Sequence, residues 1–285
     1  MRARLALACL GRLALGAVAL SAGSSASAGD DAVAGAGAPI VVRPGAVVRW
    51  EGEDLVECRL ADDVFAPEDG ACFFPIDLEA SGRLAVSRRG ARGVERRELA
   101  VGDYPYAVEQ LQVEEKYVAP SPAELERIGR EKARVSALWR LATPRRFALP
   151  LAAPLAEMSA ASRFGERRVF NGEPRSPHSG ADFKAAPGTL VFAPADGRVA
   201  LAEEQFFAGN AVYLDHGAGL ISMAFHLERI LVRAGDEVKR GQPIGRVGAT
   251  GRVTGPHLHF GLRWHGARID PVPLFGAVAD LATLD

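Results

Sequence analysis

The ten residues from Gly251 to Phe260 read GRVTGPHLHF and place two histidines, His257 and His259, at alternate positions of a candidate β-strand. Residues two apart in a strand point to the same face, so both imidazoles should project into one cleft, with Leu258 turned into the core. Histidine commonly serves as a ligand or a base. The pattern therefore favours a functional site over a structural pairing.

His178 and Asp182, in the stretch HSGADF, form a second candidate pair. In a fully extended chain, positions four apart are separated by ~13 Å. Sharing one metal ion therefore requires a bend, which Gly180 permits. Taken alone, the spacing of His178 and Asp182 is weak evidence for a metal site. Together with His257 and His259 it gives a nitrogen and oxygen set suited to zinc, and three protein ligands with one open position are typical of catalytic zinc.

Three further histidines are present. His226 lies at the end of a candidate strand, and a lone histidine there is more often structural. His216 and His265 each precede a glycine and are interpreted as turn residues outside the site. The sequence contains no His-Glu-x-x-His, no Gly-x-Ser-x-Gly and no phosphate loop, which excludes the enzyme classes that these motifs mark.

Short β-rich runs and frequent turns predict a mainly β fold. The expected architecture is an antiparallel β catalytic domain with an open cleft, preceded by a small β-rich sandwich or barrel and a linker helix. Residues 88–97, rich in arginine, are expected to form a solvated hairpin tip. The expected segments are a signal peptide (1–28), a β-rich N-terminal domain (29–118), a helical linker (119–157), an antiparallel β domain that contains all six histidines (158–275) and a C-terminal tail (276–285).

The linker helix has a clear start signal. Ser121 as N-cap, Pro122 at the first helical position and Glu124 three residues after the cap form a capping box. Apolar residues then recur at helical spacing from Leu125 to Trp139 and predict that one face packs against a neighbour.

The first residues predict export. A positively charged start is followed by the apolar run from Leu13 to Leu20, which is too short to span a bilayer. The small residues Ala26 to Ala28 fit a cleavage site, and an uncleaved anchor is the alternative. The expected location is the periplasm or cell envelope, with no stable membrane span after cleavage.

Two cysteines remain after the expected signal peptide, Cys58 and Cys72. An even pair in an oxidising compartment predicts a disulfide, worth about 3 kcal/mol by loop entropy, and two buried thiols are the alternative. The formal net charge of −1, from 34 basic and 35 acidic side chains, argues against a nucleic-acid partner.

From about residue 162 to 275 the chain resembles the lysostaphin-type (LytM-like) zinc metallopeptidases of bacterial cell walls. The order of several motifs carries the resemblance: Arg163-Phe164-Gly165, Phe170-Asn171-Gly172, His178 to Phe183, Ala193 to Gly197, Phe225-His226-Leu227, Gly235 to Val238, Gly241 to Gly245, and Gly251 to Phe260.

The resemblance implies a role for each residue. His178, Asp182 and His259 match the zinc ligands of the family, and His226 and His257 match its two catalytic histidines. One zinc ion per chain would lower the pKa of water toward ~7 and polarise the scissile carbonyl. Either histidine can accept and return a proton.

The resemblance also implies a substrate. The expected reaction is hydrolysis of peptide cross-links in peptidoglycan, first of direct D-alanyl–diaminopimelate links and second of pentaglycine-type bridges. In this family, companion domains regulate access to the active site or bind the cell wall. The same role for residues 29–118 rests only on analogy.

One alternative is a non-catalytic relative that binds the wall and activates a separate amidase, although all five site positions are filled. A lipoyl-type carrier is a weaker alternative. The family commonly has tyrosine where this sequence has Phe225.

Overall fold

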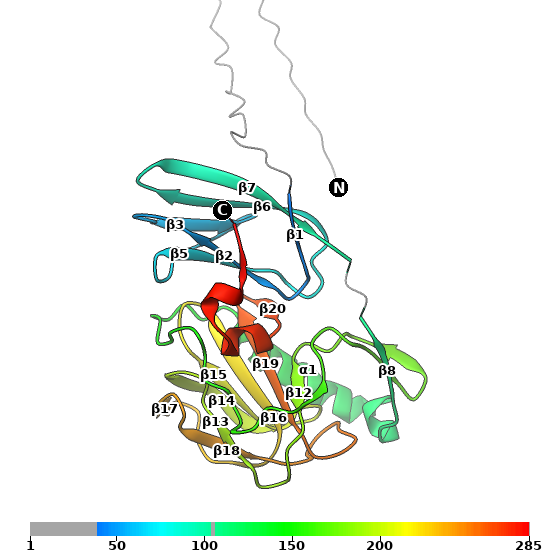
Figure 1. The fold of residues 1–285 in the computed structure, drawn as a ribbon. Coiled ribbons are helices and arrows are strands. Elements are labelled where there is room, and N and C mark those ends of the chain that lie inside the picture. Colours follow the sequence, from blue (N-terminus) through cyan, green and yellow to red (C-terminus); the bar gives the residue numbers. More distant parts are fainter. Residues whose placement is uncertain (1–38, 104–105, 285) are drawn as a thin grey trace, which may run out of the picture. The chain divides into compact units, whose positions relative to one another are not determined.

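The computed structural model describes residues 39–103 and 106–284 (Figure 1). The expected signal peptide and most of the lead that follows it lie outside the described residues. Strands dominate the described part, which contains a single α-helix, and the expected mainly β class is confirmed. No helix within these two ranges is long and apolar enough to cross a membrane.

The N-terminal part consists of two sheets that share one core. The first sheet has the strand order β1-β7-β6-β3-β4 and the second has the order β21-β2-β5. Trp50, Phe74 and Leu99 lie in the common core, each no more than 1% exposed. As expected, residues 88–97 form the far end of a hairpin, that of β6 and β7. The bounds are β1 (Ile40–Val42), β2 (Val47–Glu51), β3 (Glu57–Leu60), β4 (Asp63–Phe65), β5 (Ala71–Pro75), β6 (Gly82–Gly90) and β7 (Gly93–Val101).

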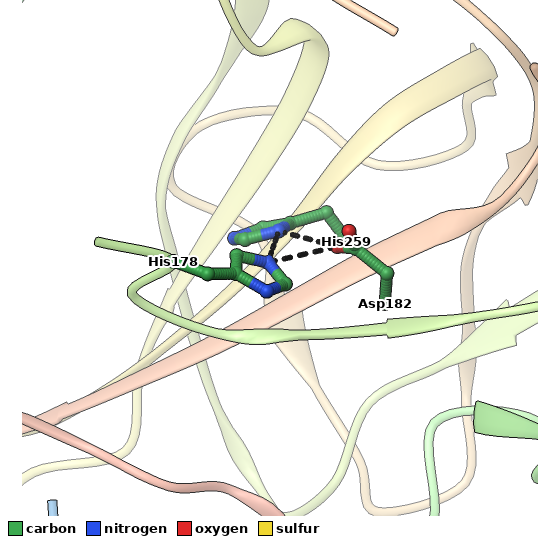
Figure 2. A group of neighbouring side chains, drawn as sticks. All are labelled: His178, Asp182 and His259. Atoms are coloured by element: carbon green, nitrogen blue, oxygen red, sulfur yellow. Dashed lines mark hydrogen bonds and ion pairs between the residues drawn. The ribbon is translucent and has the colours of Figure 1, made fainter. Parts of the chain in front are cut away.

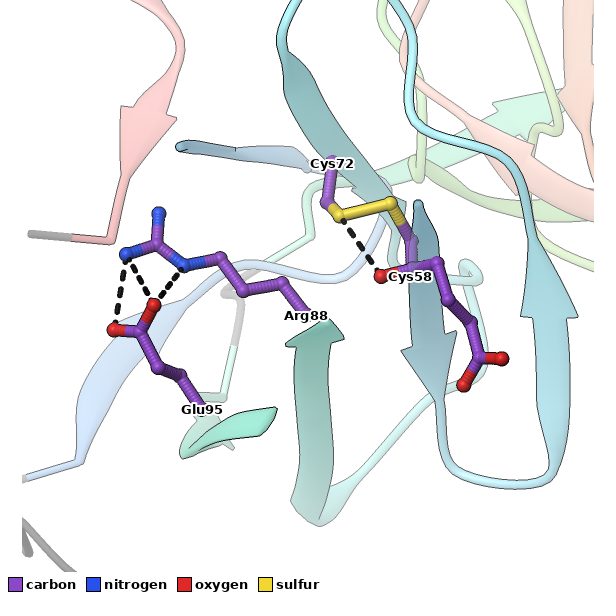
Figure 3. Close-up of a disulfide and its surroundings, with 5 residues drawn as sticks. Cys58, Cys72, Arg88 and Glu95 are labelled. Atoms are coloured by element: carbon purple, nitrogen blue, oxygen red, sulfur yellow. Dashed lines mark hydrogen bonds and ion pairs between the residues drawn. A yellow bond between two sulfur atoms is a disulfide. The ribbon is translucent and has the colours of Figure 1, made fainter. Parts of the chain in front are cut away.

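A disulfide between Cys58 on β3 and Cys72 on β5 joins these two sheets (Figure 3). Both cysteines are fully buried in the common core. Nearby, Arg88 donates two hydrogen bonds of 3.0 Å to Glu95, and its guanidinium lies 4.4 Å from the centre of the Trp50 ring. The predicted disulfide is thus confirmed, and it joins two sheets whose described strands do not pair with each other.

Strand β5 is buried on both faces because alternate residues enter different cores. Cys72 and Phe74 point into the N-terminal core, whereas Ala71 and Phe73 belong to the core of the larger C-terminal sheet. The ring of Phe73 stacks on Trp264, with ring centres 5.4 Å apart. Apolar packing therefore holds β5 against that larger sheet.

An ion pair supports the same junction. Arg268 on β20 (Ala267–Ile269) donates side-chain hydrogen bonds of 3.1 and 2.6 Å to Asp77, and its backbone N–H donates a third, of 2.8 Å. Burial alone would raise the pKa of Asp77, but the contacts with Arg268 outweigh burial and hold this pKa below its ordinary value.

A ten-stranded sheet forms the C-terminal half. Its main path is β17-β14-β15-β16-β19-β12-β9, and β13, β18 and β20 pair beside this path. Figure 1 shows β15, β16 and β19 side by side, and the pairs between them are antiparallel, as expected. The bounds are β9 (Ala160–Ser162), β12 (Ala181–Phe183), β13 (Leu190–Phe192), β14 (Gly197–Gln205), β15 (Gly209–Asp215), β16 (Leu220–Ile230), β17 (Glu237–Val238), β18 (Pro243–Val247) and β19 (Leu258–Trp264).

Helix α1 (Pro122–Leu138) begins as the sequence predicts. The Ser121 hydroxyl accepts a hydrogen bond from the Glu124 backbone N–H, and the Glu124 carboxylate accepts one of 2.7 Å from the Ser121 backbone N–H. Both halves of the capping box are therefore present.

The predicted apolar stripe of α1 packs only in part. Trp139 packs on a cluster around Tyr213, but Leu125 in the first turn is 55% exposed. The middle of the helix is instead anchored by a polar contact, because the buried Glu131 carboxylate accepts a 2.9 Å hydrogen bond from the Phe206 backbone N–H. The helical spacing of apolar residues did not predict this contact of Glu131.

Two parallel strand pairs cross the expected segment limits. Strand β8 (Val108–Leu111) pairs with β10 (Arg167–Phe170), which also pairs with β11 (Glu173–Arg175). At the other end, two short 3₁₀ turns lead into β21 (Ala282–Thr283), which pairs with β2. The turns are η2 (Val272–Phe275) and η3 (Val278–Asp280), and a third, η1 (Glu115–Tyr117), precedes α1. The expected domain limits stay a prediction.

Candidate active site

Neighbouring strands of the large sheet position the predicted ligands. Asp182 on β12 stands directly opposite His259 on β19, and His178 comes just before β12. Leu258 is fully buried in the core, as its alternation with His257 and His259 predicts. The antiparallel pairing of β12 and β19 thus brings together residues far apart in the sequence.

The side chains of His178, Asp182 and His259 converge on one point (Figure 2). His178 Nε2 lies 2.9 Å from His259 Nδ1 and 3.0 Å from Asp182 Oδ1. His259 Nδ1 lies 2.8 Å from the same carboxylate oxygen. All three residues are buried, with between 2% and 7% of their surface exposed. The three predicted ligands are therefore adjacent in the structure.

The hydrogen-bond partner of His178 indicates that this group fits a cation. His178 Nδ1 lies 2.9 Å from the carbonyl oxygen of Arg163, which can only accept a hydrogen bond. In the neutral ring Nδ1 therefore carries the proton, and Nε2 presents a lone pair toward the Asp182 carboxylate. Two acceptors 3.0 Å apart repel each other unless a positive charge lies between them. Two imidazole nitrogens and one carboxylate oxygen are ligands that zinc prefers.

Asp182 is held in its charged form. Burial alone would raise its pKa, but His178 and His259, when they carry a proton on the nitrogen that faces Asp182, outweigh burial and hold the pKa far below its ordinary value. Its second oxygen accepts a 2.5 Å hydrogen bond from Arg168 on β10, and Arg168 also pairs with Glu109 on β8 at 3.4 Å. The carboxylate thus joins the histidine pair to a positively charged strand.

A bulge in β16 directs His226 toward the same cleft. The β15–β16 register shifts so that Phe225 and His226 stand against the single residue Ala211. His226 has a φ of 63°, in the left-handed region that residues other than glycine seldom adopt. Bulges and strained residues of this kind occur next to functional sites, where they redirect a side chain.

His226 and His257 present the same nitrogen to the cleft. Each Nδ1 faces a backbone carbonyl, that of Thr250 at 2.9 Å and that of Gly255 at 2.8 Å. Each neutral ring therefore donates through Nδ1 and leaves Nε2 as an acceptor. The two ring centres are 4.9 Å apart, and His257 Nε2 lies 3.8 Å from Asp182 Oδ1.

Burial favours the neutral form of two of these rings. It lowers the pKa of His259 to about 4, although Asp182 acts in the opposite direction. Burial and the neighbouring His259 and His257 also lower the pKa of His226 well below its ordinary value. Neutral imidazoles can bind a metal or accept a proton, so both rings are ready for either task at pH 7.

Close packing on both sides fixes the ring of His259. Phe225 stacks on it with ring centres 5.1 Å apart and an angle of 9° between the planes. On another side Gly180 approaches so closely that a Cβ atom there would lie 2.8 Å from His259 Nε2. The phenylalanine that replaces the family's tyrosine thus supports a predicted ligand.

The two histidines interpreted as turn residues lie elsewhere. His216 is fully buried, with Nδ1 2.8 Å from the Asp196 carbonyl oxygen and Nε2 2.8 Å from the Ser222 hydroxyl. Burial lowers its pKa to about 4. His265 has a φ of 48°, as in a turn, and stacks on Phe65.

Sequence reasoning did not identify Arg168 as a contact of Asp182, nor Arg252 as part of the cleft wall. Arg168 is one of several arginines near the motif, and only the approach of β10 to β12 distinguishes it. Arg252 lies inside the quoted stretch GRVTGPHLHF, so its closeness to the two histidines was available as a signal.

Comparison with known proteins matches residues 176–271 to peptidase family M23. The peptidoglycan DD-endopeptidase ShyC of Vibrio cholerae is 41% identical over 123 residues. The DD-carboxypeptidase/endopeptidase Mpg of Neisseria meningitidis is 38% identical over 108 residues. These alignments cover 42% and 38% of this chain, but they span only 28% and 25% of the lengths of those two relatives.

A solved structure, described as that of a candidate M23 peptidase from Pseudomonas aeruginosa, covers much more of the chain. It is 33% identical, has a TM-score of 0.65, and the alignment covers 84% of this chain and 96% of that one. All five predicted site residues also fall within the stretch that matches the family model. Similarity over almost the whole of a relative, together with this match, establishes that the chain belongs to peptidase family M23.

Proposed function

We propose that this chain is an exported zinc endopeptidase that hydrolyses peptide cross-links in peptidoglycan. The observation that carries the proposal is the convergence of His178, Asp182 and His259 within 3.0 Å of one another, beside two histidines with an acceptor nitrogen each. A binding module has no evident need for both sets. An endopeptidase needs a metal site and a proton carrier next to it.

The residues present fit one zinc ion. His178 would bind through Nε2, His259 through Nδ1 and Asp182 through Oδ1, because these three atoms face one another. When bound, zinc supplies Lewis acidity that lowers the pKa of water and polarises a peptide carbonyl. The hydrogen bond from His178 to the Arg163 carbonyl sets the tautomer that a ligand needs.

His226 and His257 would move the protons. Each has Nδ1 fixed on a backbone carbonyl, so each can accept a proton at Nε2 and later return it to the leaving amine. Their ring centres are 4.9 Å apart, close enough for both to act on one substrate. The lowered pKa of His226 keeps this ring unprotonated, as a base must be.

The substrate follows from the named activity of the relatives. ShyC is named a peptidoglycan DD-endopeptidase, and Mpg is named a DD-carboxypeptidase/endopeptidase. We extend this activity to the present chain and place D-alanyl–diaminopimelate cross-links first among its substrates. Peptidoglycan lies outside the cytoplasmic membrane, which agrees with the export signal proposed for residues 1–28 and with a periplasmic or envelope location.

Metal binding tests the ligand assignment. The purified chain, loaded with zinc and desalted, should hold about one zinc ion per molecule by atomic emission. His259→Ala should lose it, while His216→Gln, which alters a buried histidine away from the cleft, should retain it. Zinc retained by His259→Ala at the wild-type ratio would contradict the assignment.

Measuring turnover tests the assignment of His226 and His257 as catalytic residues. It also distinguishes an endopeptidase from a protein that only activates an amidase. The chain is incubated with purified peptidoglycan, and the released muropeptides are identified by mass spectrometry. Cross-linked dimers should be converted to monomers, and His226→Ala or His257→Ala should keep zinc but convert at least 100-fold more slowly. A zinc-loaded wild-type chain that cleaves no cross-link, yet stimulates a wall amidase, would support the activator instead.

The proposal includes intramolecular regulation by the N-terminal domain (29–118), which contains β8. Glu109 on β8 lines the cleft beside Asp182 and pairs with Arg168, which also contacts Asp182. Glu109→Gln should therefore change the cleavage rate without changing the zinc content. An unchanged rate would argue against such control.

A further inference from the structure

Arg252 lies between two parts of the cleft. His178 and His259 line the first part, and Asp182 lines the second. Arg252 and His226 line both parts. A substrate that reaches the proposed metal site from either part would therefore pass this guanidinium. The proposed catalytic chemistry does not use it.

Two aromatic rings fix the position of this guanidinium. Its central carbon lies 4.5 Å from the centre of the Phe170 ring and 4.6 Å from that of Phe207. The Arg252 backbone N–H also donates a 2.9 Å hydrogen bond to the Phe207 carbonyl. Stacking of this kind occupies the faces of a planar guanidinium and leaves its N–H edge for a polar partner.

The charge of Arg252 has no protein counter-charge in the described ranges. Within residues 39–103 and 106–284 its guanidinium makes no hydrogen bond or ion pair with another side chain. Burial first, and then Arg168 and Arg175, lower the pKa of Arg252 to about 10, which still leaves it charged at pH 7. Arg252 is half-buried, and a cation partly withdrawn from water is normally paired, because without a partner it loses hydration without compensation.

Arg168 and Arg175, the two arginines near Arg252, differ in whether a negative charge pairs with them. Arg168 is neutralised by Asp182 and Glu109. Arg175 donates to the Val118 backbone carbonyl at 3.1 Å, which brings no negative charge. The wall near Arg252 is therefore positively charged and contains planar, preorganised donors. A carboxylate is the group that such a guanidinium binds best.

We propose that Arg252 is a specificity residue that binds a free carboxylate of the peptide substrate. This inference rests on the proposed peptidase function and makes its substrate class more specific. Diaminopimelate cross-links carry free carboxylates close to the cleaved bond, whereas the interior of a pentaglycine bridge carries none. Arg252 therefore selects anionic stem peptides over neutral bridges.

A matched pair of substrates tests the proposal with the unaltered chain. One is a D-alanyl–diaminopimelate cross-linked dimer, and the other is the same dimer with its diaminopimelate carboxylates converted to carboxamides. A charge-assisted hydrogen bond lost from the complex should lower kcat/KM by about 10- to 100-fold for the amidated dimer. Equal cleavage of both dimers would overturn the proposal.

Substitution at Arg252 completes the comparison. Arg252→Met keeps an apolar stem between the rings but removes the charge, and Arg198→Met alters an exposed arginine away from both parts of the cleft as a control. Arg252→Met should lose 10- to 100-fold on the charged dimer and less than threefold on the amidated dimer. The control should match the wild type on both.

The outcomes separate this inference from the proposed function. An equal loss by Arg252→Met on both dimers would show a structural role and overturn the proposal. If that variant does not fold, Arg252→Lys replaces it and should keep the preference for the charged dimer at reduced strength. A zinc-loaded wild type that cleaves neither dimer would refute the proposed function itself.

Discussion

A methyl group added at Gly180 would occupy space that β19 already fills. The Cβ atom of Gly180→Ala would lie 2.5 Å from the Phe260 carbonyl oxygen and 2.8 Å from His259 Nε2, whereas ordinary contact begins at 3.4 Å. The shortfall is about 0.9 Å at the backbone and about 0.6 Å at the ring. Because the Phe260 carbonyl belongs to the backbone of β19, the side chain of His259 should move.

A shift of that size is large for a metal site. Bond lengths to zinc are normally kept within about 0.2 Å, and disturbing the support of a ligand typically weakens metal affinity 10- to 100-fold. We therefore expect Gly180→Ala to bind zinc at least tenfold more weakly than the wild type. Overpacking should also lower the free energy of unfolding of the metal-free chain by about 1–3 kcal/mol.

Competition against a chromophoric chelator measures the zinc affinity, and a thermal melt of the metal-free chain confirms that the variant folds. Gly255→Ala is the matched control, because a Cβ atom at Gly255 meets nothing within 4 Å. This control should bind zinc as the wild type does. A zinc affinity of Gly180→Ala within twofold of the wild type would refute the reasoning.

Three further predictions concern stability, and urea unfolding measures each of them. The folded pKa of His216, about 4, lies below its ordinary 6.5, so the unfolded chain binds the proton first. Stability should therefore fall by about 3 kcal/mol as the pH drops from 6.5 to 4, and less in His216→Gln; parallel pH profiles would contradict this. Replacing Cys58 and Cys72 together by serine should cost about 3 kcal/mol by loop entropy, and an unchanged midpoint would exclude that. Asp77→Asn should cost about 1–2 kcal/mol at pH 7, because Arg268 loses one of its two carboxylate partners and keeps only Glu79. The lowered pKa of Asp77 means that this difference should shrink only as the pH falls below 3.8, and a difference constant down to pH 2 would argue against the ion pair.

Short-range rules predicted much of the site. The same-face position of His257 and His259 follows from the period of a strand, and the start of α1 at Ser121 follows from a local capping box. The pairing of Cys58 with Cys72 required only the count of cysteines and the expected compartment. These features depend on a few neighbouring residues, so the sequence is sufficient for them.

Long-range packing determined the rest. The contact of Arg168 with Asp182 requires β10 to lie beside β12, and the direction of His226 requires a bulge that only the β15–β16 register reveals. The 55% exposure of Leu125 likewise depends on how separate elements pack. Helical or strand periodicity contains none of this information, because it describes one element at a time.

The parallel pairing of β21 with β2 has a consequence for biosynthesis. Residues 282 and 283 pair with Val48 and Arg49, and Leu284 completes the N-terminal core. A ribosome releases these residues after the entire large sheet. The usual order, in which the part synthesised first folds first, is therefore reversed at this junction. Until β21 arrives, the edge of β2 that it covers stays unpaired.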